Sequence, residues 1–357
     1  MCHWGNRDKN MLTIWQMFAR LVLAMCLGAL SRPGLATEPV DASTCTAIPG
    51  NGERLKCYDA HVGRGNARDV EEPFMQFGAG SPPVPAVGSI AATALSVRWE
   101  LDPETKQGLW LLRPYRPLFV LPVRYTDNPN YSPQTPTQPP LPAPVPYNNS
   151  EAEFQLSLKT KGGENIFGTH TDLWFGYTQQ SQWQVYNSQI SRPFRETNYQ
   201  PEMFLTTPVH YELFGLSGRF VDLGFVHQSN GRSNPLSRSW NRVYAQFGFE
   251  RGNFALLVRP WYRFQEEAST DNNPDIVQYM GNGDVTAIYK LGRQEFTLLG
   301  RLNAGSGYGA AEGTWSFPVH DRLKGYVKFF SGYGETMIDY NWKQTTIGIG
   351  VLLADWL

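Results

Sequence analysis

The chain has 357 residues, of which 18% are charged and 13% aromatic, and its formal net charge at pH 7 is −1. This balance excludes a basic nucleic-acid binder, and it also excludes a disordered acidic tail as the main content of the chain.

Residues 1–36 are predicted to be a signal peptide. Three basic residues precede an apolar run at residues 21–30, and the small residues at 34–36 suit a cleavage site. The run is too short to cross a bilayer as a helix. An uncleaved helical anchor is the alternative, and it is disfavoured because Arg32 and Pro33 follow the apolar run so closely.

Two of the four cysteines, Cys2 and Cys26, fall in the signal peptide and leave with it. The remaining pair, Cys45 and Cys57, closes a short loop in an exported chain, which predicts a disulfide within a small periplasmic segment at residues 37–60. A metal or redox site is the alternative. It lacks a third ligand nearby, and the cysteines do not have the Cys-x-x-Cys spacing.

Glycine, proline and alanine dominate the next stretch, which shows no sustained period. We assign residues 61–110 to a linker that leads into the folded remainder of the chain. A dense proline cluster follows at residues 128–146. Because prolines cannot donate backbone hydrogen bonds to a sheet, this cluster predicts a loop outside the sheet. We favour a solvated loop over a site that recognises proline-binding partners.

Alternating segments of about ten residues characterise the rest of the chain, residues 111–357. Side chains on a strand switch face at every residue, so alternation predicts strands with one apolar face. The segments add up to twelve strands, and single-chain bacterial membrane barrels require an even number. The expected strands are 115–125, 154–158, 173–177, 204–211, 219–228, 239–250, 254–264, 276–289, 296–303, 313–317, 324–330 and 338–353.

No segment after residue 36 is apolar for long enough to be a membrane helix. A membrane-embedded mature chain must therefore be a closed barrel, which leaves no backbone group unpaired in hydrocarbon. Short turns alternate with longer loops, and tryptophan and tyrosine occur near many strand ends. We predict an all-β fold, a twelve-stranded antiparallel transmembrane β-barrel with an N-terminal periplasmic extension. A soluble β-sandwich also alternates and is the alternative.

Two of the predicted strands carry polar residues on an apolar face. His227 and Ser229 have the parity of the apolar residues before them, and Asn241 has the parity of the apolar residues after it. The connection between them is rich in glycine, asparagine, serine and proline, so the strands should form a hairpin. The three side chains then meet as nucleophile (Ser229), base (His227) and orienting acceptor (Asn241), which indicates ester cleavage against lipid. A polar pair at the membrane interface is the alternative.

Residues 227–242 read His-Gln-Ser-Asn-Gly-Arg-Ser-Asn-Pro-Leu-Ser-Arg-Ser-Trp-Asn-Arg, which resembles the signature of the outer membrane phospholipase A family. The resemblance extends to residues 191–199, 260–262, 273–276 and 331–340. It implies a phospholipase of the bacterial outer membrane that hydrolyses the sn-1 and sn-2 acyl esters of glycerophospholipids and also lysophospholipids. It further implies that the enzyme requires calcium and is activated by homodimerisation.

The resemblance also assigns residues to the calcium site and to the subunit interface. It implies that Ca²⁺ is bound by the Ser237 hydroxyl and the Arg232 carbonyl of one subunit, together with the Ser191 carbonyl of the other. The N–H of Gly231 and a calcium-bound water would stabilise the oxyanion. Gln179 would link the subunits within the membrane. Without the resemblance, an ordinary interior amide at position 179 is equally compatible with the sequence.

Two residues depart from the family pattern. Asn234 and Asn272 stand where acidic residues are common, and those acids form a second calcium site in the monomer. The resemblance therefore implies that this second site is weak or absent here, although Asp271 and Asp275 could compensate. The interface site does not depend on these positions.

Two other functions remain open on the sequence alone. A lipid A deacylase is also a membrane esterase, but such barrels are smaller and use an acidic third member where this chain has Asn241. A non-enzymatic pore or adhesin that retains an inactive triad is the second alternative.

Overall fold

The computed structural model describes Cys45, Glu53, Cys57 and residues 93–357 apart from 322. The predicted signal peptide and most of the predicted periplasmic segment and linker lie outside these residues. Cys45 and Cys57 are joined by a disulfide, with their Cα atoms 5.7 Å apart.

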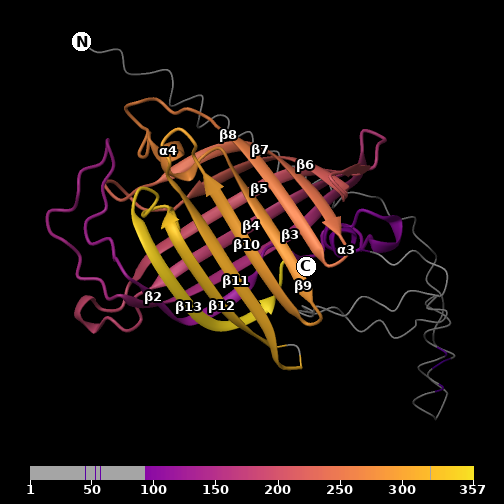
Figure 1. Cartoon of the computed structure of the whole chain (residues 1–357), viewed down its shortest axis with the longest axis horizontal. Helices are drawn as coiled ribbons and strands as arrows, with labels where there is room; N and C mark the ends of the chain where they lie inside the picture. The colour runs from indigo at the N-terminus through magenta and orange to yellow at the C-terminus, as the bar shows by residue number, and fades with distance from the viewer. Residues whose placement is uncertain (1–44, 46–52, 54–56, 58–92, 322) are drawn as a thin grey trace. The chain divides into compact units, whose positions relative to one another are not determined.

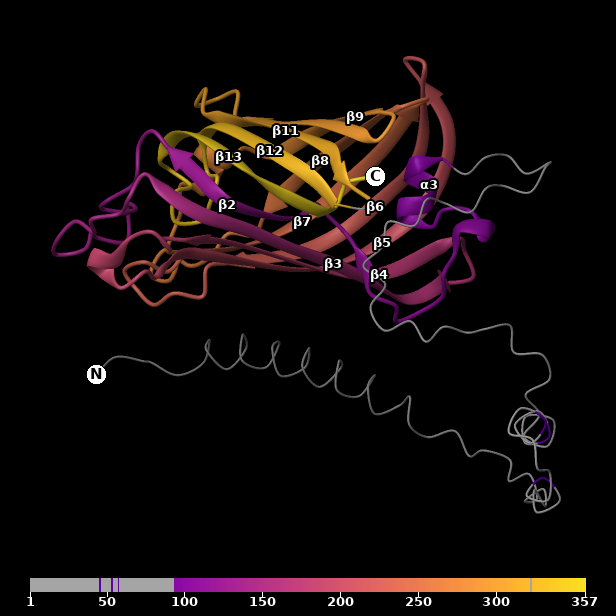
Figure 2. The ribbon, with the colours of Figure 1, turned by 90° about the horizontal axis from the view of Figure 1, so that it is seen from below.

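Twelve long strands form a closed antiparallel barrel (Figures 1 and 2). The ring closes because the first long strand, β2, pairs with both β13 and β3, and β3 pairs with β4. A short strand, β1, extends the pairing along β3 beyond the end of β2. The strands are β1 (Arg113–Pro114), β2 (Leu118–Thr126), β3 (Ser150–Ile166), β4 (Thr171–Trp183), β5 (Phe194–Leu213), β6 (Leu216–Ser229), β7 (Ser239–Arg251), β8 (Phe254–Arg263), β9 (Gly283–Leu291), β10 (Gln294–Leu302), β11 (Gly309–His320), β12 (Leu323–Tyr333) and β13 (Lys343–Ala354).

The two ends of the barrel differ in the length of their connections. One end carries tight turns, two of which place a glycine in the left-handed region, Gly252 at φ +58° and Gly292 at φ +60°. The other end carries the long connections, including the proline-rich loop (residues 128–146) and the β6–β7 loop (residues 230–238). The alternation of short turns and long loops is therefore built into the antiparallel order of the strands.

The outward surface of the barrel is apolar. Leu223, Leu298 and Ile349 are each about 60% exposed, at 60%, 58% and 58%, and they come from strands spread around the ring. Alternate residues on the same strands point into the lumen, so the outward face is apolar while the inward face is mostly polar and buried.

Charged side chains fill the lumen near the long loops. The carboxylate of Glu151 accepts from the guanidinium groups of Arg124 at 2.5 Å and Arg195 at 2.9 Å. Glu335, from the β12–β13 loop, contacts Arg124 and lies 3.1 Å from the ammonium group of Lys328. Each of these four buried charges on Glu151, Arg124, Arg195 and Glu335 therefore has a partner of opposite sign, as burial of ionised groups requires.

A short helix, α3 (Ala94–Trp99), fills the barrel end that carries the tight turns (Figure 2). Its Leu95 and Trp99 are buried, and the Trp99 ring stacks on Phe220 of β6 with centroids 4.6 Å apart. Arg98 donates to the carbonyl of Asp355 at 2.7 Å, which ties the helix to the C-terminal end of the chain. Fully burying each large apolar side chain stabilises the fold by roughly 1.5–3 kcal/mol.

The twelve-stranded barrel confirms the predicted fold class, but several predicted boundaries are wrong. The expected strand 276–289 begins with a helix, α4 (Ile276–Met280), and β9 starts only at Gly283. The expected strand 338–353 likewise begins in a loop, and β13 starts at Lys343. In both places apolar residues pack into the mouth of the barrel, since Ile276, Met280 and Tyr340 belong to one buried cluster.

The helical content is small. Within residues 93–357, apart from 322, the other helical elements besides α3 and α4 are two 3₁₀ turns, η2 (Pro103–Thr105) and η3 (Ser188–Ile190). Both α3 and η2 lie within the segment that we assigned to a linker. Among the described residues, no helix is long and apolar enough to cross a membrane.

Candidate active site

His227 and Asn241 lie opposite each other on the outward face of the barrel. They are direct partners in the pairing of β6 with β7, and Nδ1 of His227 lies 2.9 Å from Oδ1 of Asn241. Because an amide oxygen can only accept a hydrogen bond, this contact places the imidazole proton on Nδ1. Nε2 of His227 is then free to accept a proton from another group.

Ser229 follows on the same face of β6, two residues after His227. Both side chains are partly exposed on the surface that carries Leu223 and Phe225, so the parity predicted from the sequence is present in the structure. No hydrogen bond joins the Ser229 hydroxyl to the imidazole in the described structure. Hydrogen bonds of this kind are often open until substrate binds.

A buried asparagine organises the loop that follows Ser229. The side chain of Asn230 is 3% exposed, and its oxygen accepts from the backbone N–H of Arg238 at 2.9 Å. Its amide nitrogen donates to the carbonyl of Leu236 at 2.9 Å and to the carboxylate of Glu196 at 3.3 Å. Asn230 therefore closes the β6–β7 loop from inside, a role that the sequence analysis did not assign.

Gly231 occupies a position that favours glycine. Its φ is +63°, and a Cβ atom there would lie 3.0 Å from the ring of Tyr199 on β5. The backbone N–H of Gly231 donates to none of the described residues, although the N–H of the preceding Asn230 bonds to Arg238. An unpaired N–H two residues beyond Ser229 is available to a developing oxyanion.

The predicted calcium ligands supply oxygen atoms that are open to a cation. The carbonyls of Arg232 and Ser191 accept no hydrogen bond from the described residues. The Ser237 hydroxyl accepts from Nδ2 of Asn272 at 3.0 Å and keeps a second lone pair. The described residues contain no cluster of three or more His, Cys, Asp or Glu side chains that could hold a metal. A hydroxyl and two carbonyls fit a hard cation such as calcium, which takes oxygen ligands and waters.

Gln179 lies on the outward face of β4 and not in the lumen. Its amide oxygen accepts from the Tyr177 hydroxyl at 2.9 Å, and its amide nitrogen donates to Ser181 at 3.4 Å. In the pairing of β4, β5 and β6, Gln179 pairs with Tyr199, and Tyr199 pairs with Ser229. One side chain therefore separates Gln179 from Ser229 on the same outward row.

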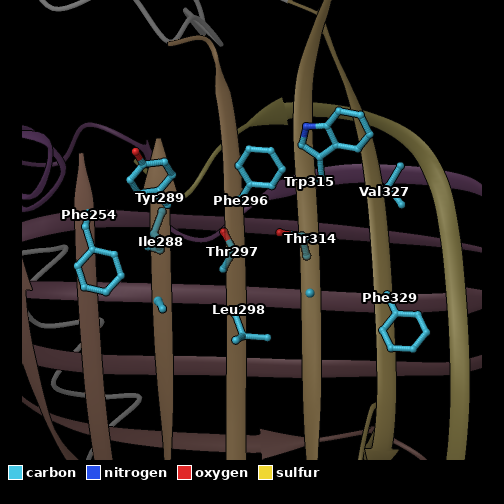
Figure 3. A pocket seen from close by; sticks show the side chains of 12 residues that line it. Phe254, Ile288, Tyr289, Phe296, Thr297, Leu298, Thr314, Trp315, Val327 and Phe329 are labelled. Atoms are coloured by element: carbon cyan, nitrogen blue, oxygen red, sulfur yellow. The ribbon is translucent and has the colours of Figure 1, made fainter. Parts of the chain in front are cut away.

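Two apolar hollows mark the outward wall. The larger, of about 750 Å³, is lined by residues of β3 to β8. Its lining includes Phe225 and Val243, which lie two residues from His227 and Asn241 on the same strands and the same face. The smaller, of about 380 Å³, lies on β8 to β12 with Ala287 and Trp315 in its lining, away from these side chains (Figure 3). Of these two hollows, only the larger adjoins His227 and Asn241.

Comparison with known proteins identifies the family. A family model described as phospholipase A1 matches residues 95–353. The chain belongs to the phospholipase A1 family. A putative phospholipase A1 of Neisseria meningitidis is 40% identical over 347 residues, which cover 88% of this chain and 91% of that protein. The phospholipase A1 of Escherichia coli K12 is 45% identical over 205 residues, or 57% of this chain and 70% of that protein.

Solved structures agree with the family assignment. Outer membrane phospholipase A from Escherichia coli superimposes with a TM-score of 0.64 at 36% identity, covering 73% of this chain and 98% of that structure. An outer membrane phospholipase from Salmonella typhi, solved as a dimer with bound calcium, gives a TM-score of 0.63 at 36% identity, covering 75% and 100%. This member of the family is therefore an ester hydrolase of the bacterial outer membrane. The alternatives of a lipid A deacylase and a non-enzymatic barrel are set aside.

Proposed function

We propose that this protein is a calcium-dependent phospholipase that cleaves both acyl esters of glycerophospholipids, and lysophospholipids, by a Ser-His-Asn mechanism. The observation that carries the proposal is the 2.9 Å contact between His227 and Asn241 on the outward apolar face, two residues before Ser229. Catalytic groups on that face meet the acyl ester of a membrane lipid without removing the lipid from the bilayer.

The proton transfers follow from the tautomer of His227. Its Nε2 takes the proton of Ser229 as the serine oxygen attacks the ester carbonyl, and the same proton then goes to the departing glycerol oxygen. Water hydrolyses the acyl-enzyme with His227 again acting as the base. Asn241 orients the imidazole throughout but cannot neutralise the imidazolium, because an amide carries no charge.

The oxyanion of the tetrahedral intermediate needs a donor and positive charge. The free N–H of Gly231 supplies the donor. Calcium, when bound, supplies positive charge near the developing oxyanion. Ser237 and Arg232 would hold it from one subunit and Ser191 from the partner, and the open lone pairs of these three oxygens support this assignment.

The outward row on β4 to β6 supports a homodimer. Gln179 is an amide on an apolar, lipid-facing wall, where a second copy of the chain offers a better partner than hydrocarbon. The β4–β5 connection, which carries Ser191, joins the two strands that hold Gln179 and Tyr199. An interface at Gln179 therefore brings Ser191 toward the other subunit, where it could complete the site at Ser237.

Hydrolysis of dispersed phospholipid by the purified full chain in detergent tests the proposal. We expect release of fatty acid with calcium, and loss of release on adding a chelator. The variant Ser229→Ala should fold as a barrel and release none, because it lacks the nucleophile. Activity retained by Ser229→Ala would remove the nucleophile assignment, and activity insensitive to chelation would remove the calcium requirement.

A further inference from the structure

The proline-rich loop packs against the β8–β9 connection instead of standing free in solvent. The hydroxyl of Thr137 donates to the carbonyl of Asp271 at 2.6 Å, and the hydroxyl of Thr135 donates to the carbonyl of Asn272 at 2.9 Å. These bonds join parts of the chain that are more than 130 residues apart in sequence. The loop predicted to be merely solvated is therefore fixed to residues that adjoin the active site.

One side chain of the loop extends this contact toward Ser237. The amide nitrogen of Gln138 donates to Oδ1 of Asn272 at 2.7 Å, and Nδ2 of Asn272 donates to the Ser237 hydroxyl at 3.0 Å. Because Gln138 binds the oxygen end of the Asn272 amide, the nitrogen end must face Ser237. Gln138 thus selects the orientation in which Asn272 holds the serine oxygen.

The residues on either side of Asn272 are themselves held firmly. Nη2 of Arg263 donates to both carboxylate oxygens of Asp271 at 2.7 Å, and such charge-assisted hydrogen bonds are stronger than neutral ones. The side-chain oxygen of Asn273 accepts from the backbone N–H of Ser239, the first residue of β7. Asn272 is therefore anchored through its backbone, and only its side chain depends on Gln138.

The loop is held at two further points. Trp342 donates to the carbonyl of Asn128 at 2.9 Å, and Asn341 donates to the carbonyl of Gln134 at 2.9 Å. Within the loop, the backbone N–H of Thr135 donates to the carbonyl of Gln138 at 2.9 Å. The side chain that reaches Asn272 thus starts from a tight, anchored turn.

We propose that the proline-rich loop braces Ser237, and that Gln138 is a positioning residue that acts through Asn272 and sets the affinity of the Ser237 oxygen for calcium. The choice of calcium as the ligand rests on the proposed function. Residue 272 is an asparagine, whose side chain can accept from one partner and donate to another. The Gln138 amide therefore holds Asn272, and Asn272 holds the Ser237 hydroxyl.

A matched pair of variants tests the brace. Gln134 lies four residues before Gln138 in the same loop, but its side chain is exposed and only its backbone carbonyl is used. Calcium titration calorimetry on the full chain should give a Kd raised about fivefold by Gln138→Leu, the factor expected for one neutral hydrogen bond. Gln134→Leu should leave the Kd unchanged. Equal Kd values for the two variants would overturn the proposal.

A rate measurement separates positioning from general damage. Gln138 touches neither the triad nor the lipid-facing wall, so Gln138→Leu should regain the wild-type rate of hydrolysis at saturating calcium. A rate that stays low at every calcium concentration would indicate a structural role and count against positioning.

Amide hydrogen exchange decides the brace even if the wild-type chain binds no calcium. That result would refute the proposed calcium dependence. The β6–β7 loop should still exchange faster in Gln138→Leu than in Gln134→Leu. Identical exchange in the two variants would overturn the brace, whatever the metal result.

Discussion

His227 is held in one tautomer by an uncharged partner. Asn241 fixes the ring through Nδ1 at 2.9 Å, yet adds no negative charge to stabilise the imidazolium. The orienting function is thereby separated from charge stabilisation, because the Asn241 amide carries no charge. The side chains of this site are placed by strand pairing, since His227 and Asn241 are direct partners in the ladder.

Substitutions of the two residues should therefore differ in severity. His227→Ala removes the base and should lower kcat by roughly 10⁴-fold. Asn241→Ala removes only the orientation of the ring. It should lower kcat by a factor roughly 50 times smaller than His227→Ala does. Initial rates on dispersed phospholipid, with calcium saturating, measure both. Equal losses would mean that Asn241 does more than orient the ring.

Strands β5 to β8 provide the wall along which an acyl chain would lie. Ala245 is four residues from Asn241 along β7, or about 13 Å. It pairs with Leu223 on β6, and its small side chain leaves room within the larger hollow. A lipid whose ester is held at Ser229 would extend its acyl chain down this wall.

Filling this hollow should select against long acyl chains. Ala245→Phe should slow the cleavage of long-chain esters and spare short-chain esters, whose chains end above this depth. Ala287→Phe is the matched control, because it fills the hollow of Figure 3, on strands away from the triad. The ratio of long-chain to short-chain rates is the measurement, and an equal change in both variants would exclude the wall as an acyl-chain site.

The sequence predicted the strands and the common outward face of His227, Ser229 and Asn241 because both depend on a period of two. His227, Ser229 and Asn241 could be assigned to one face from their parity alone. Helix α4 could not be predicted from this period, since its five residues, Ile-Val-Gln-Tyr-Met, are mostly apolar and have the composition of a strand, while Ile276 and Met280 are buried. The contacts of Asn272 with Gln138 could not be predicted, because no local pattern links residues 134 positions apart.

The barrel as a whole is stabilised by ion pairs that join its loops to its wall. Burial alone would raise the pKa of Glu335, but Arg124 and Lys328 outweigh burial and lower the pKa to about 2. A carboxyl with a lowered pKa contributes stability that is fully present above its unfolded pKa, near 4.3. That contribution is lost as the pH falls from there through about 2.

Removing this charge should destabilise the whole fold in a pH-dependent way. Glu335→Gln should lower the free energy of unfolding in urea by about 3 kcal/mol at pH 7, because it leaves Arg124 and Lys328 short of a partner. The difference from wild type should shrink below pH 4. The exposed Glu212 provides the control, and Glu212→Gln should change stability by less than about 0.5 kcal/mol. A deficit that stayed constant down to pH 2 would argue against an ionised Glu335.

The outward row from Gln179 through Tyr199 to Ser229 has a consequence for the host cell. A hydrolase whose reactive groups face the bilayer it inhabits can attack the lipids around it, and the proposed dimer would restrict that attack. On the proposed dimer, a neighbouring copy supplies what is missing, and lipid turnover rises with the square of surface density when the copies are sparse. The surface density of the protein in the membrane would then control its activity. A modest rise in abundance or in lateral clustering would greatly increase hydrolysis of the surrounding lipids.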